Sequence, residues 1–105
     1  MTEHTATATV PTALASRYLQ QLCKHWQHNL TVEFDANHGT VVFPHDARGA
    51  DHPDDALVTF DAAADALTVR IDASSAEQLE GLEGTVARHL DRFAFREAPL
   101  AFDWR

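Results

Sequence analysis

Residues 74–95 read SSAEQLEGLEGTVARHLDRFAF, and this stretch carries the strongest folding signal in the chain. Ser74 and Glu77 have the spacing of a capping box, in which a hydroxyl and a carboxylate bind free backbone N–H groups at a helix start. Beyond them, apolar side chains recur every three or four residues, as they do on one face of a helix: Leu79, Leu82, Val86, Leu90 and Phe93. The stretch therefore predicts an amphipathic helix that packs one face against a core.

Arg88, His89 and Arg92 lie in the second half of this predicted helix and give it a cationic surface. The chain as a whole is acidic, because its 105 residues carry a formal net charge of −8 at pH 7. Residues 33–83 hold twelve acidic and two basic side chains, whereas residues 4–32 hold two basic and no acidic ones. Such an acidic surface would repel a phosphate backbone, which argues against nucleic-acid binding.

The length is that of a single domain, residues 1–105, which is enough to bury about two thirds of the unfolded surface. The longest apolar runs fall short of the roughly 20 residues that a membrane span requires. The first residues lack the basic and apolar regions of a signal peptide, and the single cysteine, Cys23, excludes an internal disulfide. Together these features predict a cytoplasmic protein without membrane contact.

A strand and a second helix are predicted ahead of residue 30. Threonine alternates with alanine and valine over residues 5–10, which suits a strand with one buried face. Thr12 is the predicted N-cap of a helix over residues 13–28. Its apolar stripe consists of four residues at helical spacing: Ala15, Leu19, Leu22 and Trp26.

Four further segments alternate apolar and polar residues and predict strands: 30–35, 40–43, 57–61 and 67–72. Residues 37–39 (NHG) tolerate positive φ and predict the first hairpin turn, and residues 44–55 predict an exposed loop. The inward side chains are apolar on every strand: Val32, Phe34, Val41, Phe43, Val58, Phe60, Leu67, Val69 and Ile71. The outward ones are polar: Thr31, Glu33, Asp35, Thr59, Asp61, Thr68, Arg70 and Asp72.

The order strand, helix, four strands, helix predicts an α+β fold. Strands joined by short turns form an antiparallel sheet of about five strands, and two helices with single apolar stripes cover one of its faces. In residues 100–105, large apolar side chains alternate with others: Leu100, Phe102 and Trp104. We expect this tail to fold back and seal the core, with a dimer contact as the alternative.

Three motifs resemble the bacterial family named domain of unknown function 2218: SRYLQQLCKH at residues 16–25, VEF at 32–34 and ARHLDRFAFRE at 87–97, with DWR at 103–105. The resemblance covers nearly the whole chain. It implies a stand-alone α+β domain with a TATA-binding-protein-like arrangement, which by itself brings no nucleic-acid binding. The family has no established activity. The resemblance implies that, in some bacteria, such proteins are associated with siderophore-linked iron uptake. Relatives pass more directly between the second and third hairpin strands, so residues 44–55 resemble an insertion.

The first candidate site is a cationic surface on the two helices. Arginine binds carboxylate or phosphate with two parallel hydrogen bonds, so an anionic small molecule or an acidic protein is the expected ligand. The structural explanation, which we favour, is that these cations complement helix C-termini and form surface ion pairs. The residues are Arg17, Lys24, His25, Arg88, His89, Arg92 and Arg96.

The second candidate is a metal site in the loop, since imidazole and carboxylate suit divalent first-row ions. Its residues are His45, Asp46, Asp51 and His52, with Asp54 and Asp55 beside them. The spacing matches no EF-hand, zinc-finger or zincin motif, and an exposed acidic insertion is the favoured explanation.

The chain has no Gly-x-Ser-x-Gly elbow, P-loop or dinucleotide fingerprint, which disfavours an enzyme. A binding or accessory domain is the leading hypothesis. A metal-dependent enzyme and an oligomeric interaction protein, joined through Phe102 and Trp104, are the alternatives. The sequence leaves open the cofactor, and whether the chain is a monomer or a homodimer.

Overall fold

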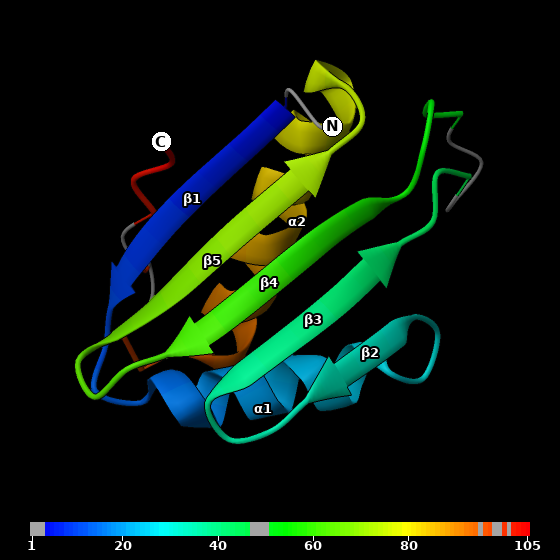
Figure 1. Cartoon of the computed structure of the whole chain (residues 1–105). Coiled ribbons are helices and arrows are strands. Elements are labelled where there is room, and N and C mark those ends of the chain that lie inside the picture. Colours follow the sequence, from blue (N-terminus) through cyan, green and yellow to red (C-terminus); the bar gives the residue numbers. More distant parts are fainter. Residues whose placement is uncertain (1–3, 47–50, 95, 98–99, 101) are drawn as a thin grey trace.

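The computed structural model describes residues 4–46, 51–94, 96–97, 100 and 102–105. Within them the elements are β1 (His4–Pro11), α1 (Ala15–Trp26), β2 (Thr31–Phe34), β3 (His38–Phe43), β4 (Ala56–Ala62), β5 (Ala66–Ala73) and α2 (Ala76–Phe93). The five strands of this described part form one sheet in the order β1-β5-β4-β3-β2, and every neighbouring pair is antiparallel (Figure 1). The predicted α+β fold and element order are confirmed.

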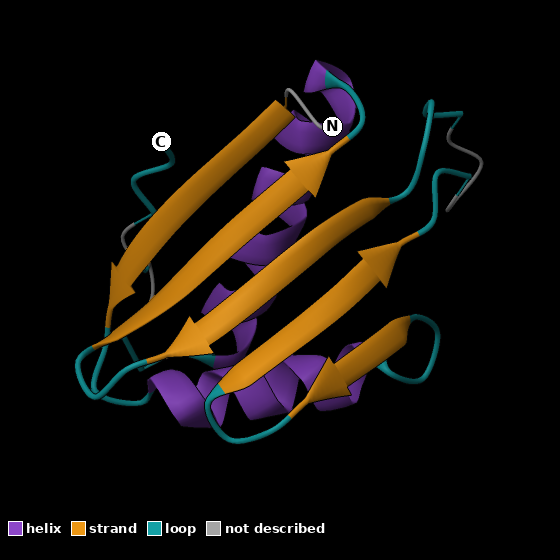
Figure 2. Ribbon diagram, viewed as in Figure 1, coloured by secondary structure: helices purple, strands orange, loops and turns teal. Residues whose placement is uncertain are grey.

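Both helices lie on the same face of the sheet (Figure 2). Helix α1 packs mainly on β2 and β3, α2 packs on β5 and β1, and the two helices contact each other. Because β1 and β2 are opposite edges of the sheet, α1 carries the chain from one edge to the other. None of the described helices is long and apolar enough to cross a membrane.

The core lies between the helices and the sheet. The predicted inward residues of β4 and β5 are completely buried, and so are Leu19 and Leu22 of α1 and Val86 and Leu90 of α2. The opposite face is polar, with an ion pair at 3.1 Å between Arg70 and Asp72 and a contact of 2.6 Å between His38 and Asp61. The predicted alternation of apolar and polar residues is therefore confirmed.

The cap of α2 differs from the prediction by one residue. Ser75, not Ser74, is the N-cap, and its hydroxyl accepts a hydrogen bond of 3.1 Å from the N–H of Gln78. Gln78, not Glu77, is the third residue of the helix, and its Oε1 accepts the N–H of Ser74 at 2.7 Å. Gln78 is buried, so the neutral amide closes the helix start where a carboxylate would have to lose its water.

The start of α1 also differs. Thr12 is not the N-cap, because Leu14 occupies that position without a side-chain cap. The hydroxyl of Thr12 accepts the N–H of Leu14 at 3.1 Å and donates to the carboxylate of Glu97 at 2.9 Å. Thr12 therefore holds the approach to the helix and links it to the segment after α2.

The first hairpin turn lies two residues before the predicted one. Asp35 Oδ1 accepts the N–H groups of Asn37 and His38 at 2.8 and 2.9 Å, and β3 begins at His38. Gly39 belongs to β3 and pairs with Phe34. Its lack of a side chain serves close packing, because a Cβ there would lie 2.9 Å from Cys23 Sγ of α1.

The C-terminal tail folds back onto the core, as expected. Leu100, Phe102 and Trp104 are half-buried against it, and the last two rings stack with centroids 5.7 Å apart. Arg105 pairs with Thr7 through two backbone hydrogen bonds of 3.0 and 2.9 Å. The tail thereby covers part of the free edge of β1, which would otherwise offer unpaired backbone groups.

Candidate ligand site between the helices

A pocket of about 590 Å³ lies between the end of α1, one side of α2 and the loop after β3. Volumes of this order accommodate small organic ligands. On α2, Gly81, Thr85 and His89 line it, because residues four apart share one side of a helix. On α1, His25 and Trp26 end the helix beside them, where the two helices meet.

His89 has a defined protonation pattern at this pocket. Its Nδ1 lies 2.7 Å from the backbone carbonyl oxygen of Thr85, one turn earlier in α2. A carbonyl only accepts hydrogen bonds, so Nδ1 carries a proton. The neutral ring consequently keeps the lone pair of Nε2, which accepts a hydrogen bond or, once protonated, donates one.

Aromatic rings surround this imidazole. The ring centroid of His89 lies 5.2 Å from that of Trp26 and 5.6 Å from that of His25. Trp26 also meets Phe43 edge to face at 5.0 Å, and Phe43 lines the pocket. Helix α1, helix α2 and β3 thus each contribute one side of an aromatic cluster.

The pKa of His25 lies below its usual value. Partial loss of water around the ring is the largest cause, followed by electrostatic repulsion from His89, Arg92 and His28. Lost water and the neighbouring groups therefore both disfavour the charged form of His25. An anion bound there would favour the protonated ring.

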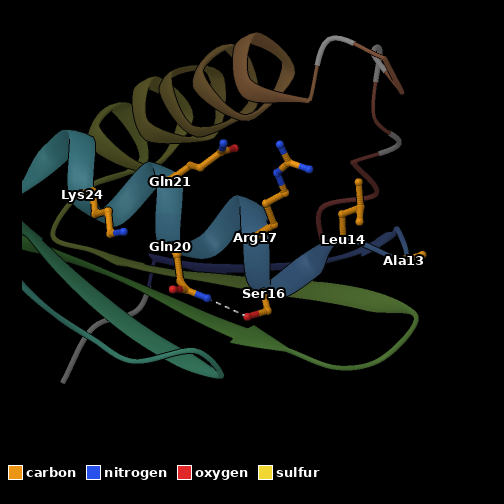
Figure 3. A pocket seen from close by; sticks show the side chains of 7 residues that line it. All are labelled: Ala13, Leu14, Ser16, Arg17, Gln20, Gln21 and Lys24. Atoms are coloured by element: carbon orange, nitrogen blue, oxygen red, sulfur yellow. Dashed lines mark hydrogen bonds between the residues drawn. The ribbon is translucent and has the colours of Figure 1, made fainter.

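A second, shallower cavity of about 500 Å³ lies on the outer face of α1 (Figure 3). Arg17 and Lys24 line it together with Gln20 and Gln21, and Gln20 donates a hydrogen bond of 3.0 Å to Ser16. The Oε1 of Gln21 is buried without a hydrogen-bond partner among the described residues. The cavity is open to solvent and formed by the first helix and the residues before it.

The predicted cationic residues are therefore divided between several places. His25 and His89 line the larger pocket, and Arg92 lies near enough to His25 to affect its charge. Arg17 and Lys24 line the outer cavity of α1. Arg88 is exposed on α2 beside the hydroxyl of Thr85, and Arg96 is exposed beyond the end of α2.

The four predicted metal ligands lie along the loop after β3. The ring of His45 pairs with Asp55 at 2.7 Å, and its carbonyl oxygen accepts the N–H of His52 at 3.0 Å. Asp46 and His52 line the larger pocket, whereas Asp51 is exposed. Across the described ranges, no three His, Cys, Asp or Glu side chains form a group that could hold a metal ion.

The carboxylate of Asp55 raises the pKa of His45, and the imidazole in turn lowers the pKa of Asp55. The contact with Asp55 uses Nδ1 of His45.

The pattern of charges did not identify Trp26, Phe43 and Thr85 as pocket residues. Trp26 and Phe43 read as core positions by their spacing, and both do contact the core. For Thr85 the sequence does hold a signal, because the spacing of Gly81, Thr85 and His89 places two small residues and an imidazole on one side of α2.

A family model described as an uncharacterized protein conserved in bacteria, DUF2218, matches residues 7–105. An NMR structure of PA4090 from Pseudomonas aeruginosa is similar to this chain with 27% sequence identity and a TM-score of 0.74. The match covers 100% of this chain and 96% of that one. No curated protein matches the sequence. Neither the family description nor the name of the Pseudomonas aeruginosa protein states a ligand or an activity.

Proposed function

This chain belongs to the bacterial family DUF2218, and we propose that it is a small binding module for an anionic small molecule. The ligand would occupy the pocket between α1 and α2. The observation that carries the proposal is the meeting of two imidazoles, His25 and His89, in one pocket with Arg92 close by.

Protonation would accompany binding. Since Nδ1 of His89 already donates to Thr85, an incoming carboxylate would take its hydrogen bond from a protonated Nε2. His25 would gain a proton for the same reason, because the anion offsets the repulsion from Arg92. Affinity should therefore rise as the pH falls from 8 to 6.

The negative group of the ligand has a preferred end of the pocket. Asp46 and Glu77 also line it, and Glu77 is the second residue of α2, about 18 Å along the helix from His89. The loop of Asp46 is fastened at that same end, where Gln78 Nε2 donates to the carbonyl of Asp54 at 3.1 Å. An anion would avoid these carboxylates and bind beside His25 and His89.

The resemblance to the family supports a proposal about the cellular setting and the class of ligand. We propose a cytoplasmic setting and include ferric chelates among the candidate ligands, because of the implied association with siderophore-linked iron uptake. An oligomer joined through Phe102 and Trp104 would have to use what remains exposed of two rings that pack on the chain's own core.

The proposal is tested by thermal unfolding of the purified chain with a panel of aliphatic and aromatic carboxylates, small polyanions and ferric chelates. A ligand at one hundred times its Kd adds about 2.7 kcal/mol to stability. In a domain of this size, each kcal/mol raises Tm by about 4–8 °C. At least one anion should give such a shift, and the shift should be larger at pH 6 than at pH 8.

The variants His89→Gln and Arg92→Gln should each reduce the shift at least several-fold. Arg70→Gln is the matched control, because it removes the same charge as Arg92→Gln from the opposite face of the sheet. A shift that survives both pocket variants, or no shift with any anion, contradicts the proposal.

A further inference from the structure

The side chains that form the walls of the pocket indicate the kind of ligand more closely than the charge of the pocket does. Trp26 is only 6% exposed and is held between Phe43, at 5.0 Å, and Phe60, at 6.3 Å between ring centroids. Phe60 is completely buried on the inner strand β4, so Trp26 rests on the centre of the sheet. The aromatic wall is thus formed before any ligand arrives.

The rings of this wall pack against one another at steep angles. Trp26 meets Phe43 edge to face, with 83° between the planes, and lies at 50° to His89. Phe43 and His89 are both only half-buried, which leaves part of each ring accessible. Offset and edge-to-face arrangements are those in which aromatic pairs attract most.

We propose that the ligand is an aromatic acid in which a single anionic group is attached to a planar ring system. This rests on the proposed function, since the anionic group is the one that binds beside His25 and His89. The ring lies along Phe43 and Leu30, which line the same pocket. The volume of about 590 Å³ holds one or two fused rings with hydrating water.

The charge distribution favours one anionic group over several. Asp46 and Glu77 repel a second negative group at the far end of the pocket, as described above. Hydroxyl groups are accepted there, because the carboxylates offer hydrogen-bond acceptors. Compounds with carboxylates at both ends of a long molecule are excluded by the same repulsion.

The test compares ligands that differ only in aromaticity. 2-Naphthoate is paired with its saturated analogue decahydro-2-naphthoate, and benzoate with cyclohexanecarboxylate, by calorimetric titration of the whole chain at pH 6. Each aromatic member should bind several-fold to about tenfold more tightly than its saturated partner. Naphthalene-2,6-dicarboxylate should bind more weakly than 2-naphthoate.

The variant Phe43→Leu keeps an apolar side chain at the half-buried position and removes its ring. It should lose most of the aromatic preference. Phe102→Leu, in the C-terminal tail, is the matched control and should keep the preference. Equal affinities within each pair, or a preference unchanged by Phe43→Leu, overturn the inference while leaving anion binding in place. Absence of binding by all these acids and by the other anions overturns the proposed function and this inference with it.

Discussion

At the scale of single residues, the most informative group is His25. It is exposed for the most part, yet partial desolvation and three neighbouring groups, His89, Arg92 and His28, lower its pKa. A histidine whose pKa falls on folding binds fewer protons in the native state than in the unfolded chain. Its protonation therefore opposes folding as the pH falls below its usual pKa of about 6.5.

We predict that NMR titration places the pKa of His25 below the usual histidine value. Arg92→Gln should raise it part of the way, because one repelling charge is removed while the desolvation remains. Lys24→Gln, which removes a cation from the outer face of α1, is the control and should change it less. A His25 that titrates at or above the usual value would contradict this account of the pocket. A bound aromatic acid should raise the pKa in the unmodified chain.

At the scale of elements, side-chain periodicity located the helices and strands, and local polar contacts decided where they end. Ser74 with Glu77, and Ser75 with Gln78, both have the three-residue spacing of a capping box. Burial decided between the two pairs, because the helix start is closed by Ser75 and the buried Gln78. Thr12 fits a cap equally well, but its hydroxyl is used by Glu97, 85 residues away in sequence. Such contacts leave no local signal in the chain.

Gly39 lies where β3 packs closely against α1. We predict that Gly39→Ala destabilises the protein by about 1–3 kcal/mol, because its methyl group would meet Cys23 Sγ at 2.9 Å and Phe34 Cβ at 3.2 Å. Unfolding in urea measures the change.

Gly81→Ala is the matched control for this substitution. Nothing lies within 4 Å of a Cβ at Gly81, in the interior of α2, so alanine should stabilise the helix by about 0.5–1 kcal/mol. Equal effects of the two substitutions on the free energy of unfolding would show that α1 and β3 can move apart at no cost.

At the scale of the whole molecule, Glu97 joins the segment after α2 to the start of α1. Its carboxylate accepts hydrogen bonds from the hydroxyls of Thr12 and Tyr18, and both of these residues are buried. Desolvation, and then the hydrogen bond to Glu97, raise the pKa of Tyr18, which keeps the phenol protonated as a donor. The tail beyond Glu97 then reaches the edge of β1 at Thr7.

We predict that Glu97→Ala costs about 1–3 kcal/mol of unfolding free energy, because two buried hydroxyls lose their acceptor. Asp103→Ala is the control, since it removes the same charge from the tail but only an exposed pair with Arg105. Chemical denaturation of both variants measures the difference. A loss as large in Asp103→Ala as in Glu97→Ala would mean that net charge, not the buried contact, stabilises the tail.

Sequence alone determined the α+β class, the order of the elements and the faces they bury, because hydrophobic periodicity is a local property that each segment carries with it. It also singled out His25, His89 and Arg92 as candidates. The tertiary structure decided the strand order β1-β5-β4-β3-β2 and the meeting of His25 and His89 with Trp26 and Phe43 in one pocket, with Arg92 near His25. It also separated them from Arg17 and Lys24. These are contacts between segments distant along the chain, and they arise from how two helices share one face of a sheet, which no single stretch of sequence encodes.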